Sequence, residues 1–115
     1  MTVWHPMDVS GAELALVEFS EYIDNRQPDE GLTTIRLAKI AEQAGEMLGA
    51  HIRHQGRNIL KEDHTVTEDD VAARVLSVAF CALAAYEHLT DHAGRSMSDL
   101  ITLIGDMHAK TVAEP

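Results

Sequence analysis

Apolar residues recur at intervals of three and four along most of this chain, and that spacing is the feature that most constrains its fold. Such intervals return side chains to one face of an α-helix, whereas a half-buried strand needs strict alternation. Alternating runs of β-branched residues are few. The sequence therefore predicts an all-α protein made of four helices.

The first two predicted helices are marked by their boundary residues. Ser10-Gly11-Ala12-Glu13 has the spacing of a capping box, and the helix that it opens is predicted to end near Asn25. Pro28 and Gly31 interrupt the chain before a second helix, and Gly56 stands where a C-terminal glycine is expected. A short connection and two amphipathic helices are thus expected in the first half.

The third and fourth helices differ in how their apolar residues are distributed. Thr67 is a capping residue followed by acids, and the helix is predicted to run to about Leu89. Its segment Val78–Ala85 is apolar nearly all round, which is typical of a helix with neighbours on more than one side. The fourth helix, about Ser96 to Val112, carries a single apolar stripe: Met97, Leu100, Ile101, Ile104 and Met107.

Length and charge limit the classes of protein to consider. A chain of 115 residues predicts a single domain spanning residues 1–115. The net charge of −10 argues against a nucleic-acid polymer as partner, because such proteins need a basic face. The lone Cys81 lies in an apolar run too short to cross a bilayer, and no targeting segment is apparent. We expect a soluble cytoplasmic protein with no membrane partner.

Three short segments resemble the MazG-like family, the all-α nucleoside triphosphate pyrophosphohydrolases. They are Arg36–Glu46, Gly56–Lys61 and Asp69–Arg74, similar to the family's metal-binding helix, its G-Q-N-P-R-K loop and its D-E-V-A-A-E helix start. They occur in the family's order, and the resemblance covers about residues 32–110. It implies a four-helix MazG-like bundle completed by dimerisation, as a homodimer or a dimer of dimers.

The family resemblance also implies a magnesium site, and most of its acids are replaced here. The family's Glu-x-x-Glu becomes Gln43 and Glu46, with Glu42 also acidic, and its Glu-x-x-Asp becomes Arg74 and Ser77. Mg²⁺ needs several oxygen ligands. We expect the Arg74 guanidinium to project toward Glu46 and to take the place of the metal.

Other residues are weaker candidates for the same chemistry. Asp70, one turn before Arg74, is a further acid for a displaced Mg²⁺ site, although acids at a helix start also serve the helix dipole. A metal site rebuilt from Glu62, Asp63 and His64 is a further alternative. The histidine pairs His51/His54 and His88/His92 have metal-pair spacing but no evident third ligand, which favours surface or partly buried histidines, and no Ser-His-Asp order is visible.

Basic residues near these positions could grip phosphate oxygens. The candidates are Lys39, Arg57, Asn58 and Lys61, with Arg36 nearby. Ile59 stands where the family loop has proline, and an ordinary polar loop is the alternative reading.

Three functions are compatible with this sequence. The first is a MazG-like protein that is catalytically impaired or inactive and binds a nucleotide or a protein as a dimer, with no cofactor. The second is an active hydrolase that uses Mg²⁺ bound by Glu42, Glu46 and Asp70 to convert a nucleoside triphosphate to the monophosphate and pyrophosphate. The third is a purely structural helical dimerisation module.

Overall fold

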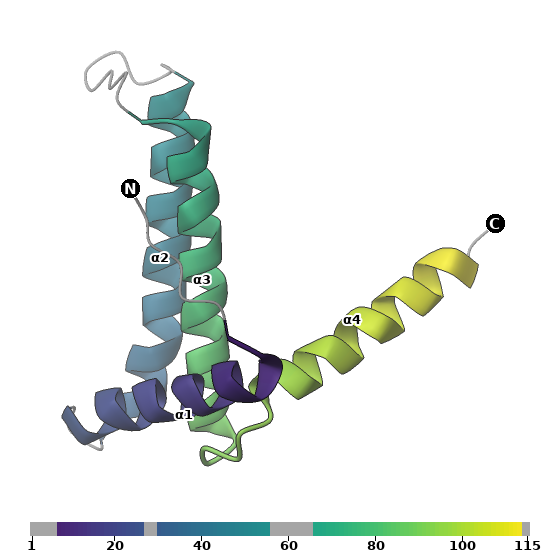
Figure 1. Ribbon diagram of the computed structural model, residues 1–115. Coiled ribbons are helices and arrows are strands. Elements are labelled where there is room, and N and C mark those ends of the chain that lie inside the picture. Colours follow the sequence, from purple (N-terminus) through teal and green to yellow (C-terminus); the bar gives the residue numbers. More distant parts are fainter. Residues whose placement is uncertain (1–6, 27–29, 56–65, 114–115) are drawn as a thin grey trace.

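A computed structural model describes residues 7–26, 30–55 and 66–113, and these residues form four α-helices and no strand (Figure 1). The helices are α1 (Val9–Arg26), α2 (Leu32–His54), α3 (Glu68–Leu89) and α4 (Ser96–Ala113). The all-α class and the four predicted helices are therefore confirmed, with ends within a few residues of those expected.

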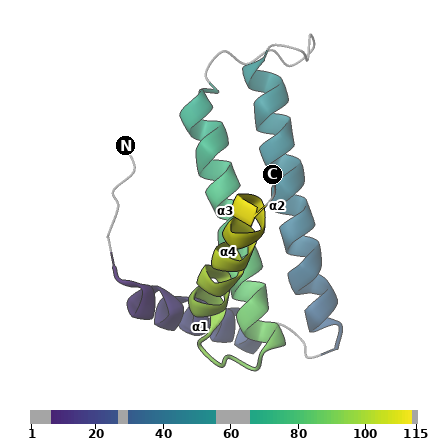
Figure 2. The ribbon, with the colours of Figure 1, turned by 90° about the vertical axis from the view of Figure 1, so that its right-hand side faces the viewer.

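Helices α2 and α3 run antiparallel, side by side, as a long hairpin, and α1 crosses its base (Figures 1 and 2). The buried apolar residues in the described part of the chain are few and mostly small: Leu16, Leu32, Ala50, Ala84 and Ala85. Four of them lie on the hairpin helices, and three of these four are alanines, whose small side chains let two helix backbones approach closely. The core therefore holds α1 against the hairpin, but it is small for a chain of this length.

Helix α4 leaves the base of the hairpin and projects away from it (Figure 1), and in Figure 2 it points toward the viewer in front of α3. Every residue from Ile101 to Ala113 is exposed. The chain exposes 8552 Å² in total, whereas a compact monomer of its mass exposes about 6,200 Å². Its radius of gyration is 17.0 Å, compared with roughly 13 Å for a compact domain of this length. The four helices do not close into a bundle within one chain.

The capping box predicted for the first helix is wrong by two residues. The Asp8 carboxylate accepts a 2.7 Å hydrogen bond from the Gly11 N–H, so Asp8 caps α1 and Ser10 lies inside the helix. Glu13 instead accepts a 2.8 Å hydrogen bond from the Ser98 N–H in the first turn of α4. An acid near a helix start can thus serve a second helix that is distant in sequence.

The start of α3 has the expected chemistry. The Thr67 hydroxyl accepts from the Asp70 N–H, and the Asp70 carboxylate accepts from the Thr67 N–H, which is a complete capping box. Among the described helices, α3 alone is long and apolar enough to cross a membrane by length and composition. The same apolar character suits a helix that contacts α1, α2 and α4, as α3 does.

Candidate functional site

The Arg74 guanidinium lies on α3 and faces Glu46 on α2, as expected from the sequence. Its Nη1 is 3.4 Å from the Glu46 Oε2, and the two side chains are 42% and 46% exposed. This half-exposed ion pair connects the two helices at the positions that resemble the MazG-like metal motifs.

The neighbouring family positions are not arranged as ligands. Ser77 donates a 3.2 Å hydrogen bond to the carbonyl of Ala73 within its own helix, and Asp70 takes part in the capping box of α3. Asp70, Arg74 and Ser77 line one side of an open hollow of about 470 Å³ whose other wall includes Arg53. Two guanidinium groups therefore border the hollow where the family resemblance would place acids.

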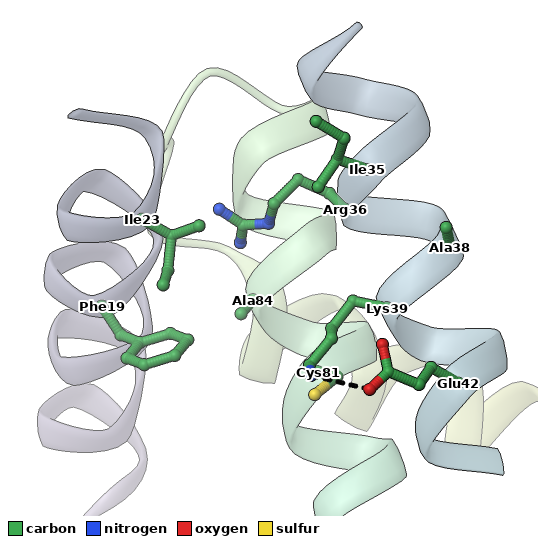
Figure 3. Close-up of a pocket in the computed structure, with 9 residues that line it drawn as sticks. All are labelled: Phe19, Ile23, Ile35, Arg36, Ala38, Lys39, Glu42, Cys81 and Ala84. Atoms are coloured by element: carbon green, nitrogen blue, oxygen red, sulfur yellow. Dashed lines mark hydrogen bonds and ion pairs between the residues drawn. The ribbon is translucent and has the colours of Figure 1, made fainter. Parts of the chain in front are cut away.

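Lys39 and Glu42 meet on the α1 side of α2, in an open cleft of about 430 Å³ (Figure 3). The Lys39 Nζ lies 3.3 Å from the Glu42 Oε1, and both side chains are more than half exposed. The rest of the lining is mainly apolar and comes from three helices: Phe19, Ile23, Ile35, Arg36, Ala38, Cys81 and Ala84. Lys39, predicted to bind phosphate, and Glu42, predicted to bind a metal ion, thus lie at the edge of an apolar cleft.

These residues do not fit a magnesium ion. Glu46 is paired with Arg74, and Glu42 is paired with Lys39. Among the described residues, no group of three or more His, Cys, Asp or Glu side chains could hold a metal ion. Since Mg²⁺ is bound through carboxylates and water in octahedral geometry, a guanidinium beside the remaining acid opposes its binding.

The rest of the predicted site lies outside the described residues. It comprises the phosphate candidates Arg57, Asn58 and Lys61 and the alternative ligands Glu62, Asp63 and His64. Arg36 lines the cleft at Lys39, but its guanidinium is paired with Asp24 on α1. It is 6% exposed and extends toward α1 (Figure 3), because its charge is matched there by Asp24.

A polar cluster at the base of the hairpin, which was not predicted from the sequence, is centred on Asp24. Its Oδ1 lies 2.9 Å from the Arg36 Nη1, and its Oδ2 lies 2.8 Å from the His88 Nδ1 and 3.2 Å from the His92 Nε2. Arg36 also donates to the carbonyl and hydroxyl oxygens of Ser20. The four-residue spacing of His88 and His92 indicates that their side chains lie on the same side of the chain. Their common partner, Asp24, could not be found from that spacing because it is 64 or more residues away in the sequence.

Glu87 is completely buried and organises the turn between α3 and α4. Its carboxylate accepts 2.8 Å hydrogen bonds from the Gly94 and Ser96 N–H groups. Burial alone raises the pKa of Glu87, but hydrogen bonds from Ser96, Gly94 and Arg95 outweigh burial and hold the pKa below its ordinary value. In the same turn Asp91 and His92 have φ values of 54° and 58°, which is unusual without glycine.

No family model, curated protein or solved structure matches this chain. The family resemblance therefore rests on the sequence motifs.

Proposed function

We propose that this protein is a MazG-like dimer that is catalytically impaired or inactive as a pyrophosphohydrolase and binds a nucleotide. The observation that carries the proposal is the Arg74–Glu46 ion pair. The family resemblance would place carboxylates on both α2 and α3 at these positions. Here an arginine faces a glutamate, so the two charges cancel.

The charges around the pair argue against catalysis by the resident acids. Arg74 and Arg53 both border the hollow beside Glu46, and they repel a divalent cation at short range. Glu42 already has a lysine partner, and Asp70 already takes part in the capping box of α3. An active hydrolase would have to break each of these contacts before it could bind the metal.

Nucleotide binding is supported by the cleft at Lys39. Its volume of about 430 Å³ lies within the roughly 300–1,000 Å³ range of small-molecule sites. Phe19, Ile23 and Cys81 supply apolar surface for a base, and Lys39 supplies a charge for a phosphate at the edge (Figure 3). The phosphate would compete with Glu42 for Lys39, so we expect affinity in the micromolar range or weaker.

Dimerisation is supported by the surface that a single chain leaves uncovered. The exposed area exceeds that of a compact monomer by roughly 2,300 Å², and much of the apolar part lies on α4 and α3. On α4 the exposed large residues include Ile101, Ile104 and Met107. On α3, Leu76 and Phe80 border an apolar groove of about 370 Å³ beside α1. We propose that α4 of a second copy fills this groove.

Pyrophosphate release from a panel of nucleoside triphosphates with Mg²⁺ or Mn²⁺ tests the catalytic part of the proposal. The natural protein should show no release above buffer. A variant with Gln43→Glu, Arg74→Glu and Ser77→Asp should gain metal-dependent release, because these changes restore the acids that the family resemblance implies. Turnover by the natural protein would overturn the proposal and favour a displaced metal site.

Thermal unfolding with and without nucleotides tests the binding part. A nucleotide at 100 times its Kd stabilises the folded state by about 2.7 kcal/mol. The shift should be lost in Lys39→Ala and kept in Lys110→Ala, which removes an exposed lysine of α4. A natural protein that is dimeric and shows no shift with any nucleotide would instead favour the purely structural dimerisation module.

A further inference from the structure

We propose that Thr33, His88 and Asp24 form a hydrolytic site for small acyl esters, separate from the cleft at Lys39. The three residues come from α2, α3 and α1 and are joined in a line. The Thr33 Oγ1 lies 2.9 Å from the His88 Nε2, and the His88 Nδ1 lies 2.8 Å from the Asp24 Oδ2. This is the order of contacts by which a hydroxyl nucleophile is activated in acyl transfer.

The chemistry of the three groups determines the direction of the hydrogen bonds. The ionised Asp24 carboxylate can only accept, so the His88 Nδ1 carries the proton that it donates. When the imidazole carries only this proton, its Nε2 has a free lone pair, which accepts the Thr33 O–H. His88 is therefore placed to take the proton of Thr33 as that hydroxyl attacks.

Asp24 is a positioning residue that is itself held in place. Arg36 binds its Oδ1 at 2.9 Å and leaves Oδ2 directed at His88, and both the Asp24 and the His88 side chains are only 15% exposed. His92 also contacts Oδ2, at 3.2 Å, from the following turn. The carboxylate and the imidazole are thus fixed by neighbours in three helices, so little reorganisation is needed for proton transfer.

Thr33 stands in the first turn of α2, just after Gly31, and is exposed to solvent. Backbone N–H groups in the first turn of a helix have no partner in the helix, and Gly31 has no side chain with which to cap them. These groups and the helix dipole favour negative charge at the start of α2, in the turn that carries Thr33. The threonine and its base therefore lie together at a helix start whose electrostatics favour negative charge.

The reaction has two balanced steps. In the first, the Thr33 Oγ1 bonds to the ester carbonyl carbon, its proton moves to the His88 Nε2, and the alcohol leaves with that proton as the C–O bond breaks. In the second, water attacks the acyl-threonine, His88 takes a proton from the water and returns it to Oγ1, and a carboxylic acid is released. Because Thr33 is branched at Cβ and solvent-exposed, a short, unhindered acyl group suits it best.

Release of p-nitrophenol from p-nitrophenyl acetate by the full chain tests this site. We expect release above buffer that falls by about 100-fold in Thr33→Ala and in His88→Gln, within the range of general-base catalysis. Thr33→Ser should retain activity. The matched control is Thr102→Ala, which removes an exposed hydroxyl that donates only to the carbonyl of Ser98 on α4. The helical circular dichroism of each variant verifies folding.

Intact-mass and peptide mass spectrometry during turnover locate the acyl group. An acetyl group on Thr33 in the natural protein, absent in Thr33→Ala, supports the proposal. Release at the buffer rate by the natural protein overturns it. Release that persists in Thr33→Ala also overturns it, because a histidine would then be attacking the ester directly. None of these results depends on nucleotide binding or on the Arg74 position.

Discussion

The carboxylate of Glu87 accepts a 2.8 Å hydrogen bond from the backbone N–H of Ser96, nine residues later and at the start of α4. The other oxygen of the Glu87 carboxylate accepts from the Gly94 N–H, so one buried side chain is hydrogen-bonded to two backbone groups of the turn. A buried carboxylate is destabilising unless it is hydrogen-bonded, and here the backbone supplies the donors. The direction in which α4 departs is therefore linked to the ionisation of Glu87.

We predict that Glu87→Gln lowers the free energy of unfolding at pH 7 by about 2–4 kcal/mol, since two charge-assisted hydrogen bonds are weakened and an amide N–H₂ meets backbone donors. Urea unfolding followed by circular dichroism measures this. Glu18→Gln, at an exposed position of α1, is the control and should change stability little.

The same carboxylate predicts how stability depends on pH. Because the folded-state pKa of Glu87 is lowered, its contribution is fully present above the unfolded-state pKa of about 4.3. It is lost as the pH falls through the lower folded-state pKa. The free energy of unfolding should therefore decline below about pH 5, and less steeply in Glu87→Gln. Equal slopes for the two proteins would show that Glu87 is not the group responsible.

Local patterns predicted the helices well because each signal acts within one element. Thr67 and Asp70 are three residues apart, so the capping chemistry is visible in the sequence and occurs in the structure. The Arg74–Glu46 pair was also expected, because the family resemblance aligns the two helices that carry it.

Long-range features could not be read in the same way. The contact of His88 with Asp24 spans 64 residues and depends on how α1 crosses the hairpin. The departure of α4 depends on left-handed backbone at Asp91 and His92, where neither residue is glycine. Helical spacing predicts which face of α4 is apolar. It does not predict whether that face packs against the same chain or against another one.

Tyr86 provides a prediction at alkaline pH. Its hydroxyl donates to the Asp99 carboxylate, and this hydrogen bond, followed by burial and the charge of Asp99, raises the pKa of Tyr86. Because the raised pKa favours the neutral phenol in the folded state, its contribution is present below about pH 10 and is lost as the pH rises through the folded-state pKa.

Absorbance titration of the Tyr22→Phe variant isolates Tyr86, because the chain has two tyrosines. The midpoint should be higher in the folded protein than in the same variant in guanidinium chloride. The added change Asp99→Asn should return the midpoint toward the unfolded value. A midpoint that is the same in folded and unfolded chains would contradict the Tyr86–Asp99 contact.

Arg36 and Arg74 allow a buried ion pair to be compared with an exposed one, since each arginine pairs with one acid. Arg36→Met should destabilise the protein by about 3–5 kcal/mol, because it leaves the partly buried Asp24 without its guanidinium partner. Arg74→Met should change stability by less than about 1 kcal/mol, because both members of its pair are nearly half exposed. Chemical unfolding of both variants measures the difference. Similar effects would mean that Arg74 is buried in the assembled protein, for example beneath a partner chain.

The apolar face of α4 predicts the assembly state. Ile101 and Ile104 are 49% and 58% exposed in the single chain, so burying the rest of both stabilises an interface by about 1.5–3 kcal/mol for each chain, or about 3–6 kcal/mol in a symmetric dimer. The double change Ile101→Asp and Ile104→Asp should weaken the dimer at least about 100-fold, because each 1.4 kcal/mol is tenfold in affinity. Light scattering over a concentration series measures the mass. Asp106→Asn, an exposed change on the same helix, should leave the dimer intact. A variant that stays dimeric would place the interface elsewhere, and a natural protein that is monomeric at micromolar concentration would contradict dimerisation itself.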